Sequence, residues 1–389
     1  MSRRGALLAT LVLTAAVLSG CANFSTTTVT VLHPWSGAEE TAFKAILDKL
    51  DDGEPYRIVP VGTSSYRQVL ELGLAQGKPA DIVIMPSLGE LAEYARQGLV
   101  QPIDSAEHPY PWNVWERLGS ARGPRYGVAV KAQLKSLTWA KRPGEEWCMG
   151  VGDASAPGWP GTDWVEDILL RDGGPGTYRK WAAGQVPWTG DQVRSAWSSW
   201  LKDYVAKVRG GSKAVLLNKF ADSNTGLPLL DPRGTCQNDR RSSYVLGDYR
   251  PFTPRRFDTG VGTVVSADFA ALVTRGDAAT AVLGKLASRD TQRAWLESGS
   301  GFPVDPQVRQ DREVPGSSES MVQTALAQSN KLCFDASDLM PVVQRTAFEQ
   351  AVLNVLEDPG RLPDVLARLD KTDAGVTEAR LDLPCGNAR

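Results

Sequence analysis

From residue 28 to residue 97 the chain alternates apolar segments with amphipathic ones. Three segments are rich in β-branched and other apolar side chains, as strands are: 28–32, 56–61 and 79–85. In the stretch after each of them, apolar positions recur every three or four residues, which predicts helices from residue 37, over 66–76 and over 88–97. Strands that alternate with helices over short connections predict a parallel sheet with helices on both faces.

The pattern after residue 125 is mainly helical. Two further strands, over 126–131 and 135–139, would run towards a second lobe. Helical spacing returns in later segments: 163–171, 191–208, 277–286, 290–297, 317–329, 342–357 and 362–369. Residues 222–262 are rich in Pro, Gly, Arg and Asp, which is typical of loops. The chain is therefore predicted to be an α/β protein, and its length favours two domains.

Three loops follow the carboxyl ends of the predicted parallel strands: 34–37, 62–65 and 85–87. In open α/β sheets, ligands bind at this edge. Trp35, Ser36 and Ser65 are therefore predicted to lie where a ligand would bind, together with Pro86. Ser64 or Ser65 would also cap the following helix.

The first 21 residues have the pattern of an export signal. Two arginines precede an apolar run over 6–17, which is too short to span a bilayer. Residues 18–21 (Leu-Ser-Gly-Cys) form a bacterial lipobox, whose cysteine thiol accepts a diacylglycerol. The alternatives are an ordinary secretory signal or a short membrane anchor. We predict a lipoprotein signal peptide over 1–20 and a tether over 21–27, lipidated at Cys21, on the outer face of a bacterial plasma membrane.

Composition narrows the class of partner. The 389 residues carry 43 basic and 45 acidic side chains, a net charge of −2. Because no basic surplus is present to neutralise phosphates, nucleic acid is not an expected partner. The 42% of hydrophobic and 23% of charged residues are typical of a globular protein.

Four cysteines follow the leader, an even number in an oxidising compartment. Three pairings are possible. We favour Cys148–Cys236 and Cys333–Cys385, because this choice keeps the last bridge local and ties down the tail.

The remaining residues give little sign of catalysis. The only histidines are His33 and His108, and no cysteines have ligand-like spacing, so neither a metal site nor a histidine-dependent nucleophile is expected. Phosphate-loop and dinucleotide fingerprints are absent, and no cofactor is expected. A glycan hydrolase is the enzymatic alternative, but no pair of carboxylates marks one.

Tryptophans are concentrated in one region: seven of the 12 lie between residues 147 and 200. An indole ring can stack on the apolar face of a sugar, while polar groups bind the hydroxyls. We interpret Trp35, Trp159 and Trp164 as candidate stacking residues, because they lie in or beside Gly/Pro turns. Others have helical spacing and are expected in the core: Trp181, Trp197 and Trp200. Asp163 and Asp338 could accept hydroxyl hydrogen bonds, but Asp338 could equally belong to a helix-capping turn.

Several motifs, in order, resemble the extracellular solute-binding proteins of carbohydrate ABC importers. After the lipobox, residues 35–40 (Trp-Ser-Gly-Ala-Glu-Glu), 77–82 and 126–128 are similar to the opening, the third strand and the entry to the second lobe of that family. Residues 158–164 (Gly-Trp-Pro-Gly-Thr-Asp-Trp) and 335–341 resemble its α-glucoside-type branch from actinobacteria.

The resemblance implies a two-lobe fold of the periplasmic-binding-protein type II. Each lobe would be a mainly parallel sheet flanked by helices, with hinge strands between the lobes. Lobe one would contain 28–131 plus 261–300, and lobe two 132–260 plus 301–385. Both proposed disulfides would then lie within lobe two.

The resemblance also implies a function without chemistry on the ligand. A monomeric, lipid-anchored protein would capture a sugar, with an oligosaccharide or α-glucoside favoured, and deliver it to permease subunits. The alternative is a lipoprotein that senses a ligand and signals to a membrane kinase or a cell-wall partner. The residues expected at the ligand are Trp35, Ser36, Glu39, Ser65, Pro86, Trp159, Asp163, Trp164 and Asp338.

The sequence departs from the family in places that bear on the ligand. Between Trp139 and Trp147 a helix usual in the family is missing, Ser87 stands where Gln is expected, and residues 264–268 lack glycines. An arginine-rich segment is also unusual, and we expect it to form a solvated face or else to favour an anionic ligand: Arg240, Arg241, Arg250, Arg255 and Arg256.

Overall fold

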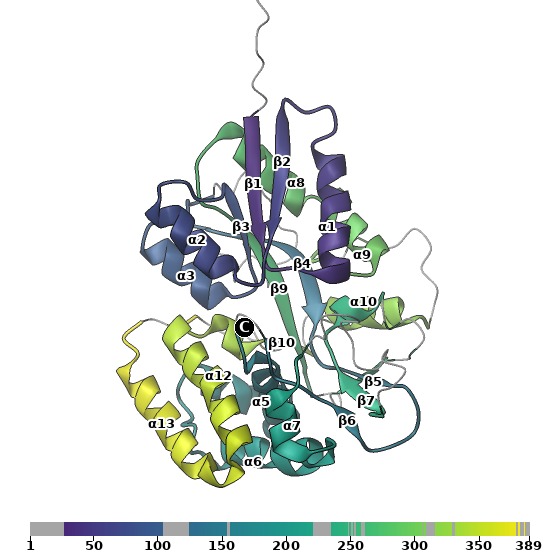
Figure 1. Cartoon of the computed structure of the whole chain (residues 1–389), viewed down its shortest axis with the longest axis vertical. Coiled ribbons are helices and arrows are strands. Elements are labelled where there is room, and N and C mark those ends of the chain that lie inside the picture. The colour runs from purple at the N-terminus through teal and green to yellow at the C-terminus, as the bar shows by residue number, and fades with distance from the viewer. Residues whose placement is uncertain are drawn as a thin grey trace, which may run out of the picture.

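The computed structural model shows two α/β lobes, one above the other in Figure 1. It describes residues 27–385 with these gaps: 104–123, 154–155, 221–234, 248, 250–251, 253, 258–260, 306, 309–315, 329–330, 379 and 382–384. The predicted signal peptide, Cys21, His108 and Arg250 lie outside the described residues. Among those described, no helix is both long and apolar enough to cross a membrane.

The larger sheet has the strand order β10-β9-β3-β1-β2, with β4 also paired to β9. The predicted parallel strands are confirmed, since β1 (Thr27–His33) pairs in parallel with both β2 (Tyr56–Gly62) and β3 (Ile82–Met85). The three predicted helices follow as α1 (Gly37–Leu50), α2 (Tyr66–Ala75) and α3 (Leu88–Arg96). Phe43, Ile46 and Leu47 of α1 are buried against the sheet, as their spacing predicts.

Two long strands connect the lobes. β4 (Val128–Leu134) and β9 (Thr263–Leu272) pair in antiparallel fashion, and β9 also pairs with β3 at one end and with β10 (Leu332–Phe334) at the other. Figure 1 shows both strands descending from the upper lobe to the lower one. β9 is buried along its whole length, so its pattern of exposure has no strand-like alternation.

The lower lobe is built mainly from helices, and its small sheet is mixed. The sheet order is β6-β7-β5-β8, in which β5 (Leu137–Ala140) is antiparallel to both β7 (Asn238–Arg240) and β8 (Pro254–Arg256). Only β6 (Trp147–Cys148) pairs in parallel, so this sheet differs from the mainly parallel one expected. β7 and β8 fall in the segment predicted as loop, because strands of three residues are too short to show alternation.

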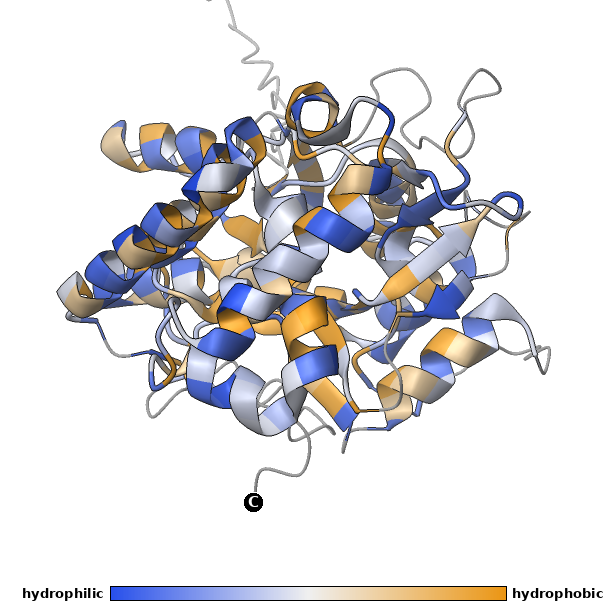
Figure 2. Ribbon diagram, turned by 90° about the horizontal axis from the view of Figure 1, so that it is seen from below, coloured by the Kyte–Doolittle hydropathy of each residue, from blue (hydrophilic) through white to orange (hydrophobic). Residues whose placement is uncertain are grey.

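The helices of the lower lobe enclose a tryptophan-rich core. They are α5 (Trp159–Ala182), α6 (Asp191–Ser199), α7 (Gly211–Leu217), α12 (Val342–Glu357) and α13 (Leu362–Gly375). Trp181, Trp188 and Trp197 surround Phe348, and Trp200 packs against Trp197, which confirms the core role predicted for three of these tryptophans. Figure 2 shows the helices around the molecule carrying hydrophilic and hydrophobic positions side by side, as amphipathic helices do.

The remaining helices complete both lobes: α8 (Asp277–Ala287), α9 (Arg289–Ser298), α10 (Ser318–Ala327) and α11 (Ala336–Leu339). The predicted helix over 191–208 is interrupted, because α6 is followed by a π-helical turn, Trp200–Tyr204, and a 3₁₀ turn, Val205–Lys207. Both favoured disulfides are present, Cys148–Cys236 and Cys333–Cys385. The second one ties the tail to β10.

Candidate functional site

Polar side chains follow one face of β4. Beyond the bulge between Ala129 and Lys131, alternation along the strand places Lys131, Gln133 and Lys135 on the same side. Ala132 and Leu134, between them, are buried in the hydrophobic core. We call Lys131, Gln133 and Lys135 the β4 stripe. It runs along the connection between the lobes.

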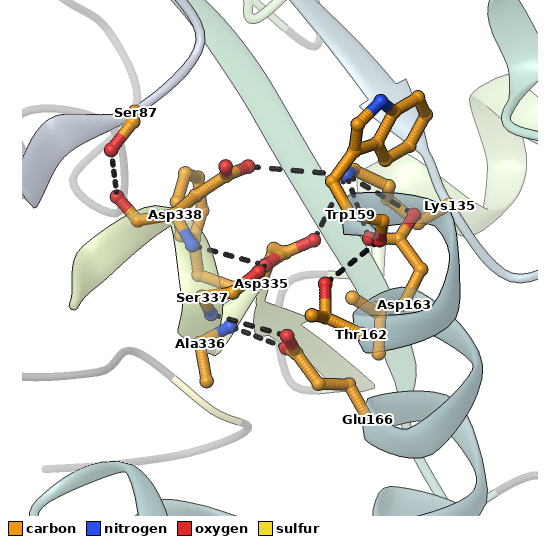
Figure 3. Close-up of polar contacts among 12 residues, drawn as sticks. Ser87, Lys135, Trp159, Thr162, Asp163, Glu166, Asp335, Ala336, Ser337 and Asp338 are labelled. Carbon is orange, nitrogen blue, oxygen red and sulfur yellow. Dashed lines mark hydrogen bonds and ion pairs between the residues drawn. The ribbon is translucent and has the colours of Figure 1, made fainter. Parts of the chain in front are cut away.

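The ammonium group of Lys135 lies among three aspartates from two segments far apart in sequence (Figure 3). Its Nζ atom is 2.9 Å from Oδ2 of Asp335, 3.3 Å from Oδ2 of Asp163 and 4.0 Å from Oδ2 of Asp338. Asp163 is the fifth residue of α5, whereas Asp338 lies in α11 and Asp335 directly precedes that helix. Asp335 also caps α11, because it accepts hydrogen bonds from the Asp338 amide (3.1 Å) and the Ser337 hydroxyl (2.7 Å). This turn was predicted to cap the helix from Val342, but Asp335 caps α11 instead, and α12 (Val342–Glu357) follows Pro341 without a side-chain cap.

Two further carboxyl groups of α5 lie beside this cluster. Asp167 accepts a hydrogen bond from Nε of Arg240 (2.6 Å), which brings β7 against α5. Glu166 accepts hydrogen bonds from the Tyr178 hydroxyl (2.6 Å) and from the Ala336 amide (2.7 Å). Among the described residues, the site therefore contains five carboxyl groups and two cations: Asp163, Glu166, Asp167, Asp335 and Asp338 against Lys135 and Arg240.

Burial, and then the neighbouring charges, change the acidity of these carboxyl groups. Burial raises the pKa of Asp163 to about 6, although Lys135 opposes the shift. Burial, and then the charge of Asp335, raise the pKa of Asp338 well above its usual range. For Asp335 burial acts in the same direction, but Lys135 and the hydrogen bonds of the capping turn outweigh it and lower the pKa. Asp338 thus holds a proton far more readily than Asp335, and its carboxyl group can donate as well as accept hydrogen bonds.

Trp159 forms the aromatic wall of this cluster. Its ring centroid is 5.4 Å from Nζ of Lys135, and its side chain is half-buried. Gly158, with φ of 105°, precedes it, and a Cβ atom there would lie 2.3 Å from the Glu349 carbonyl oxygen. The turn before α5 thus requires glycine and directs Trp159 towards Lys135.

The segment after β3 reaches the same place from the upper lobe. The Ser87 hydroxyl donates a hydrogen bond to the main-chain oxygen of Asp338 (3.0 Å), and Figure 3 shows the two residues facing each other. The same hydroxyl accepts a hydrogen bond from the Glu90 amide (3.2 Å) and so caps α3. The predicted Pro86 is therefore next to a residue that contacts Asp338.

A second polar cluster surrounds Lys131. Its Nζ atom lies 4.4 Å from the Trp35 ring and 4.6 Å from the Trp295 ring. It also pairs with Glu39 and, at 3.4 Å, with Asp268. Asp268 in turn accepts a hydrogen bond from the Trp35 indole (3.0 Å). The charge of Asp268 contributes to the raised pKa of Asp338, so the two clusters lie within electrostatic reach of each other.

The structure divides the predicted residues into groups. Trp159, Asp163 and Asp338 gather around Lys135, whereas Trp35 and Glu39 belong to the Lys131 cluster. The other four predicted residues are Ser36, Ser65, Trp164 and Pro86, the last of which directly precedes Ser87.

Two of the candidate stacking tryptophans are core residues. Trp35 is 5% exposed and packs on Phe43 and Trp295, and Trp164 is 3% exposed and packs on Trp147, Tyr204 and Phe257. A position in a loop next to Gly and Pro therefore did not mean that the indole ring is exposed to a ligand.

The two serines predicted near a ligand stand at the starts of helices. Ser36 is exposed before α1, and Ser65 is half-buried before α2. Ser65 stands at the N-cap position as expected, but its side chain makes no capping hydrogen bond.

The expectation of a solvated arginine face is wrong for Arg240 and Arg241, which are buried and paired with acids. Arg240 contacts Asp167, and Nε of Arg241 lies 3.0 Å from Asp239. These two guanidinium groups are thus neutralised within the protein. Arg255, by contrast, is exposed.

Sequence reasoning missed the residues that organise both clusters: Lys131, Gln133, Lys135, Asp268 and Asp335. One signal for the β4 stripe was present, since polar residues alternate with apolar ones over 131–135. No local pattern marks the aspartates.

Two further observations concern metal ligands and a surface hollow. Among them no group of three or more His, Cys, Asp or Glu side chains is arranged to hold a metal ion. A surface hollow of about 690 Å³ lies at the start of β1 and β2, lined by residues such as Thr27, Tyr56 and Asp277. It is at the amino ends of the parallel strands, opposite the edge at which ligands of such sheets bind.

Comparison with known proteins gives three kinds of likeness. Residues 36–223 match the family described as bacterial extracellular solute-binding protein. Two curated relatives are the alpha-glucosides-binding periplasmic protein AglE of Rhizobium meliloti (27% identical, 81% of this chain and 80% of AglE) and the osmoprotective compounds-binding protein GgtB of Synechocystis (26%, 80% and 84%).

Solved structures agree on the fold. A chitin oligosaccharide binding protein superposes with a TM-score of 0.70 at 16% identity, covering 90% of this chain and 100% of the other. RafE in complex with raffinose superposes with a TM-score of 0.65 at 12% identity, covering 90% and 99%. These likenesses confirm the two-lobe α/β fold expected from the sequence.

Proposed function

We propose, from the match of residues 36–223 to the family described as bacterial extracellular solute-binding protein, that this chain is the substrate-binding protein of an ABC importer of carbohydrates. It would capture a sugar between the lobes and deliver it, unchanged, to permease subunits. AglE and GgtB are both named as binding proteins of small molecules, which supports a binding role.

The observation that carries the proposal is that Trp159 and Asp338 both lie around Lys135. A half-buried indole and a carboxyl group on the same ammonium group would offer a sugar both a surface for stacking and a partner for its hydroxyls. The two residues come from α5 and α11, and Ser87 of the upper lobe contacts Asp338 directly. A ligand there would touch both lobes.

The charges favour a neutral or amine-bearing sugar over a sugar acid. Carboxylates outnumber cations around Lys135, and Arg240 and Arg241 are already paired with acids. Among the described residues there, an anionic ligand would meet acids, and cations that are already paired with acids. An oligosaccharide or α-glucoside is the ligand class we favour, in keeping with the name of AglE.

Roles for individual residues follow from their surroundings. Trp159 would stack on the sugar, and Asp338 would exchange hydrogen bonds with its hydroxyls. Asp163, which Lys135 holds, would orient the cluster. The remaining predicted residues at the strand ends would line the rim on the lobe-one side: Ser36, Glu39, Ser65 and Pro86. Because the rings of Trp35 and Trp164 are buried, we assign them to support rather than to stacking.

The remaining parts of the proposal concern location and domains. Cys21 would carry the lipid that holds a monomer on the extracytoplasmic face of the membrane. Lobe one would be 28–131 plus 261–300 and lobe two 132–260 plus 301–385, hinged at β4 and β9. Detergent partitioning and intact-mass measurement of the wild-type chain and of Cys21→Ser would test the anchor.

The ligand is tested with residues 21–389 carrying Cys21→Ser. Isothermal titration against neutral oligosaccharides, amino sugars and sugar acids should give binding only in the first two groups. Trp159→Ala should abolish binding, whereas Trp159→Phe, which keeps a ring, should retain part of it. Unchanged affinity in Trp159→Ala would remove this site, and absence of binding across the whole panel would remove the carbohydrate proposal.

A further inference from the structure

The start of α3 packs directly on the turn between α11 and α12. Both segments are distant in sequence from β4 and β9, the strands that connect the lobes. On the upper side are Ser87, Gly89 and Glu90, and on the lower side Asp338, Met340 and Arg345. We call these six residues the α3–α11 contact. Ser87 donates its hydrogen bond to the Asp338 carbonyl here (3.0 Å).

Gly89 makes the closest approach of the two main chains in this contact. A Cβ atom on Gly89 would lie 1.9 Å from the main-chain oxygen of Met340 and 2.8 Å from its carbonyl carbon. Since the obstacle is backbone, no rotation of a side chain would relieve the collision. Gly89 lies inside α3, where alanine is a better helix former by about 1 kcal/mol. Helix stability therefore does not explain the glycine, and the close packing does.

An ion pair crosses the same contact. Glu90 is buried and receives a hydrogen bond from the Tyr66 hydroxyl (2.9 Å), while Nε of Arg67 lies 2.7 Å away, both within the upper lobe. From α12, Nη2 of Arg345 lies 3.3 Å from the same carboxylate. If the lobes separated, Tyr66 and Arg67 would still hold Glu90, and Arg345 would keep Glu349 at 3.7 Å. Neither charge would lose all its partners, so this ion pair can form and break as the lobes move.

The contact also shares a residue with the proposed ligand site. The main chain of Asp338 accepts the Ser87 hydrogen bond, while its side chain lies 4.0 Å from Lys135. A ligand that fixes the Asp338 side chain would also fix the main chain on which α3 packs. Binding and contact formation would then favour each other.

We infer that the α3–α11 contact forms when the lobes close, and that Gly89 is a positioning residue that sets the ligand affinity without touching the ligand. The inference rests on the proposed function in taking the lobes to move around a ligand. Gly89→Ala would hold the lobes apart at this point. It would lower the fraction of closed protein, and the apparent affinity falls in proportion to that fraction.

Small-angle X-ray scattering and titration on residues 21–389 with Cys21→Ser test the inference. The matched control is Gly375→Ala, because Gly375 lies in α13 and a Cβ atom there meets nothing within 4 Å. We expect Gly89→Ala to have a larger radius of gyration than the wild type and the control without ligand, to compact less with ligand, and to bind it about tenfold or more weakly.

Other outcomes are decisive as well. The inference is wrong if Gly89→Ala matches Gly375→Ala in scattering and affinity. It is also wrong if Gly89→Ala only lowers the melting temperature at an unchanged radius of gyration, because the contact would then be permanent and would not depend on lobe closure. If Gly89→Ala does not fold, Arg345→Met replaces it and should also enlarge the radius of gyration. If no carbohydrate binds the wild type, the proposed function fails, but the comparison without ligand still decides the role of Gly89.

Discussion

Lys135 and Asp335 form an ion pair of 2.9 Å between residues from opposite halves of the chain. Asp335 caps α11, and Lys135 follows β4, so this single pair joins a connecting strand to the turn that carries Asp338. Lys135 therefore lies at the centre of the candidate site and is the cation that its three aspartates share.

Removal of the Lys135 ammonium should destabilise the fold. In Lys135→Met the buried carboxylates lose a shared cation, and breaking a buried ion pair costs about 3–5 kcal/mol. Lys44→Met is the matched control, because Lys44 is exposed and pairs with Glu40 within α1, where the expected loss is below about 0.5 kcal/mol. Urea unfolding at pH 7 measures both. Equal losses in the two variants would mean that Lys135 does not organise the cluster.

Replacement of Trp164 should destabilise the fold more than replacement of Trp159. Trp164→Ala removes a ring that packs on Trp147, Tyr204 and Phe257, and should cost about 3–5 kcal/mol of the free energy of unfolding. Trp159→Ala removes a half-buried ring and should cost less than about 2 kcal/mol. Chemical denaturation of the two variants separates these roles. A greater loss for Trp159 than for Trp164 would contradict the assignment of Trp164 to the core.

His33 should make the fold less stable in acid. It is buried beside Trp35 and Phe43, and burial lowers its pKa from 6.5 to about 4. Because the folded protein binds a proton on His33 less readily than the unfolded chain, the contribution of His33 to stability is complete above pH 6.5. It is lost as the pH falls towards 4, by about 2–3 kcal/mol.

The matching measurement is the free energy of unfolding between pH 4 and pH 7.5. His33→Phe keeps a ring in the same place and should remove this part of the slope. A slope that is the same in His33→Phe and in the wild type would show that His33 is not its source.

The bridge between Cys148 and Cys236 should support the lower lobe. It closes a loop over a sequence separation of 88 residues, and its loss should cost about 2–5 kcal/mol. The double variant Cys148→Ala with Cys236→Ala, unfolded in guanidinium and compared with Cys21→Ser alone, tests this. Intact mass under non-reducing conditions should show that Cys333–Cys385 still forms in the variant, and a mass that indicates free thiols there would contradict independent bridges.

The sequence predicted the elements whose patterns are long and regular. β1, β2 and α1 to α3 appear where alternation and helical spacing place them, because one face of each is more buried than the other. β3 is buried along its whole length and was predicted from its continuous apolar run. β9 was not predicted as a strand, because its ten buried residues include polar ones and show neither alternation nor a continuous apolar run. β7 and β8 have three residues each, too few for a period to be recognised.

The candidate site was predicted less completely than the fold. Trp159 and Asp338 were found through their neighbours in turns, but Lys135 and Asp335 meet only after the chain has folded. Their pairing depends on a distance between segments that no local spacing records. Trp35 is a prediction of the opposite outcome. Its loop follows the carboxyl end of β1, as predicted, but its ring packs in the core.

The two ends of the described chain belong to different halves of the molecule. β1 starts at Thr27 in the upper lobe, and the bridge from Cys333 fixes Cys385 beside β10, where the lower lobe begins. A donor fluorophore joined to one end and an acceptor joined to the other would therefore lie on different lobes. Under the proposed function, the distance between the two dyes would report ligand binding without any insertion inside the fold.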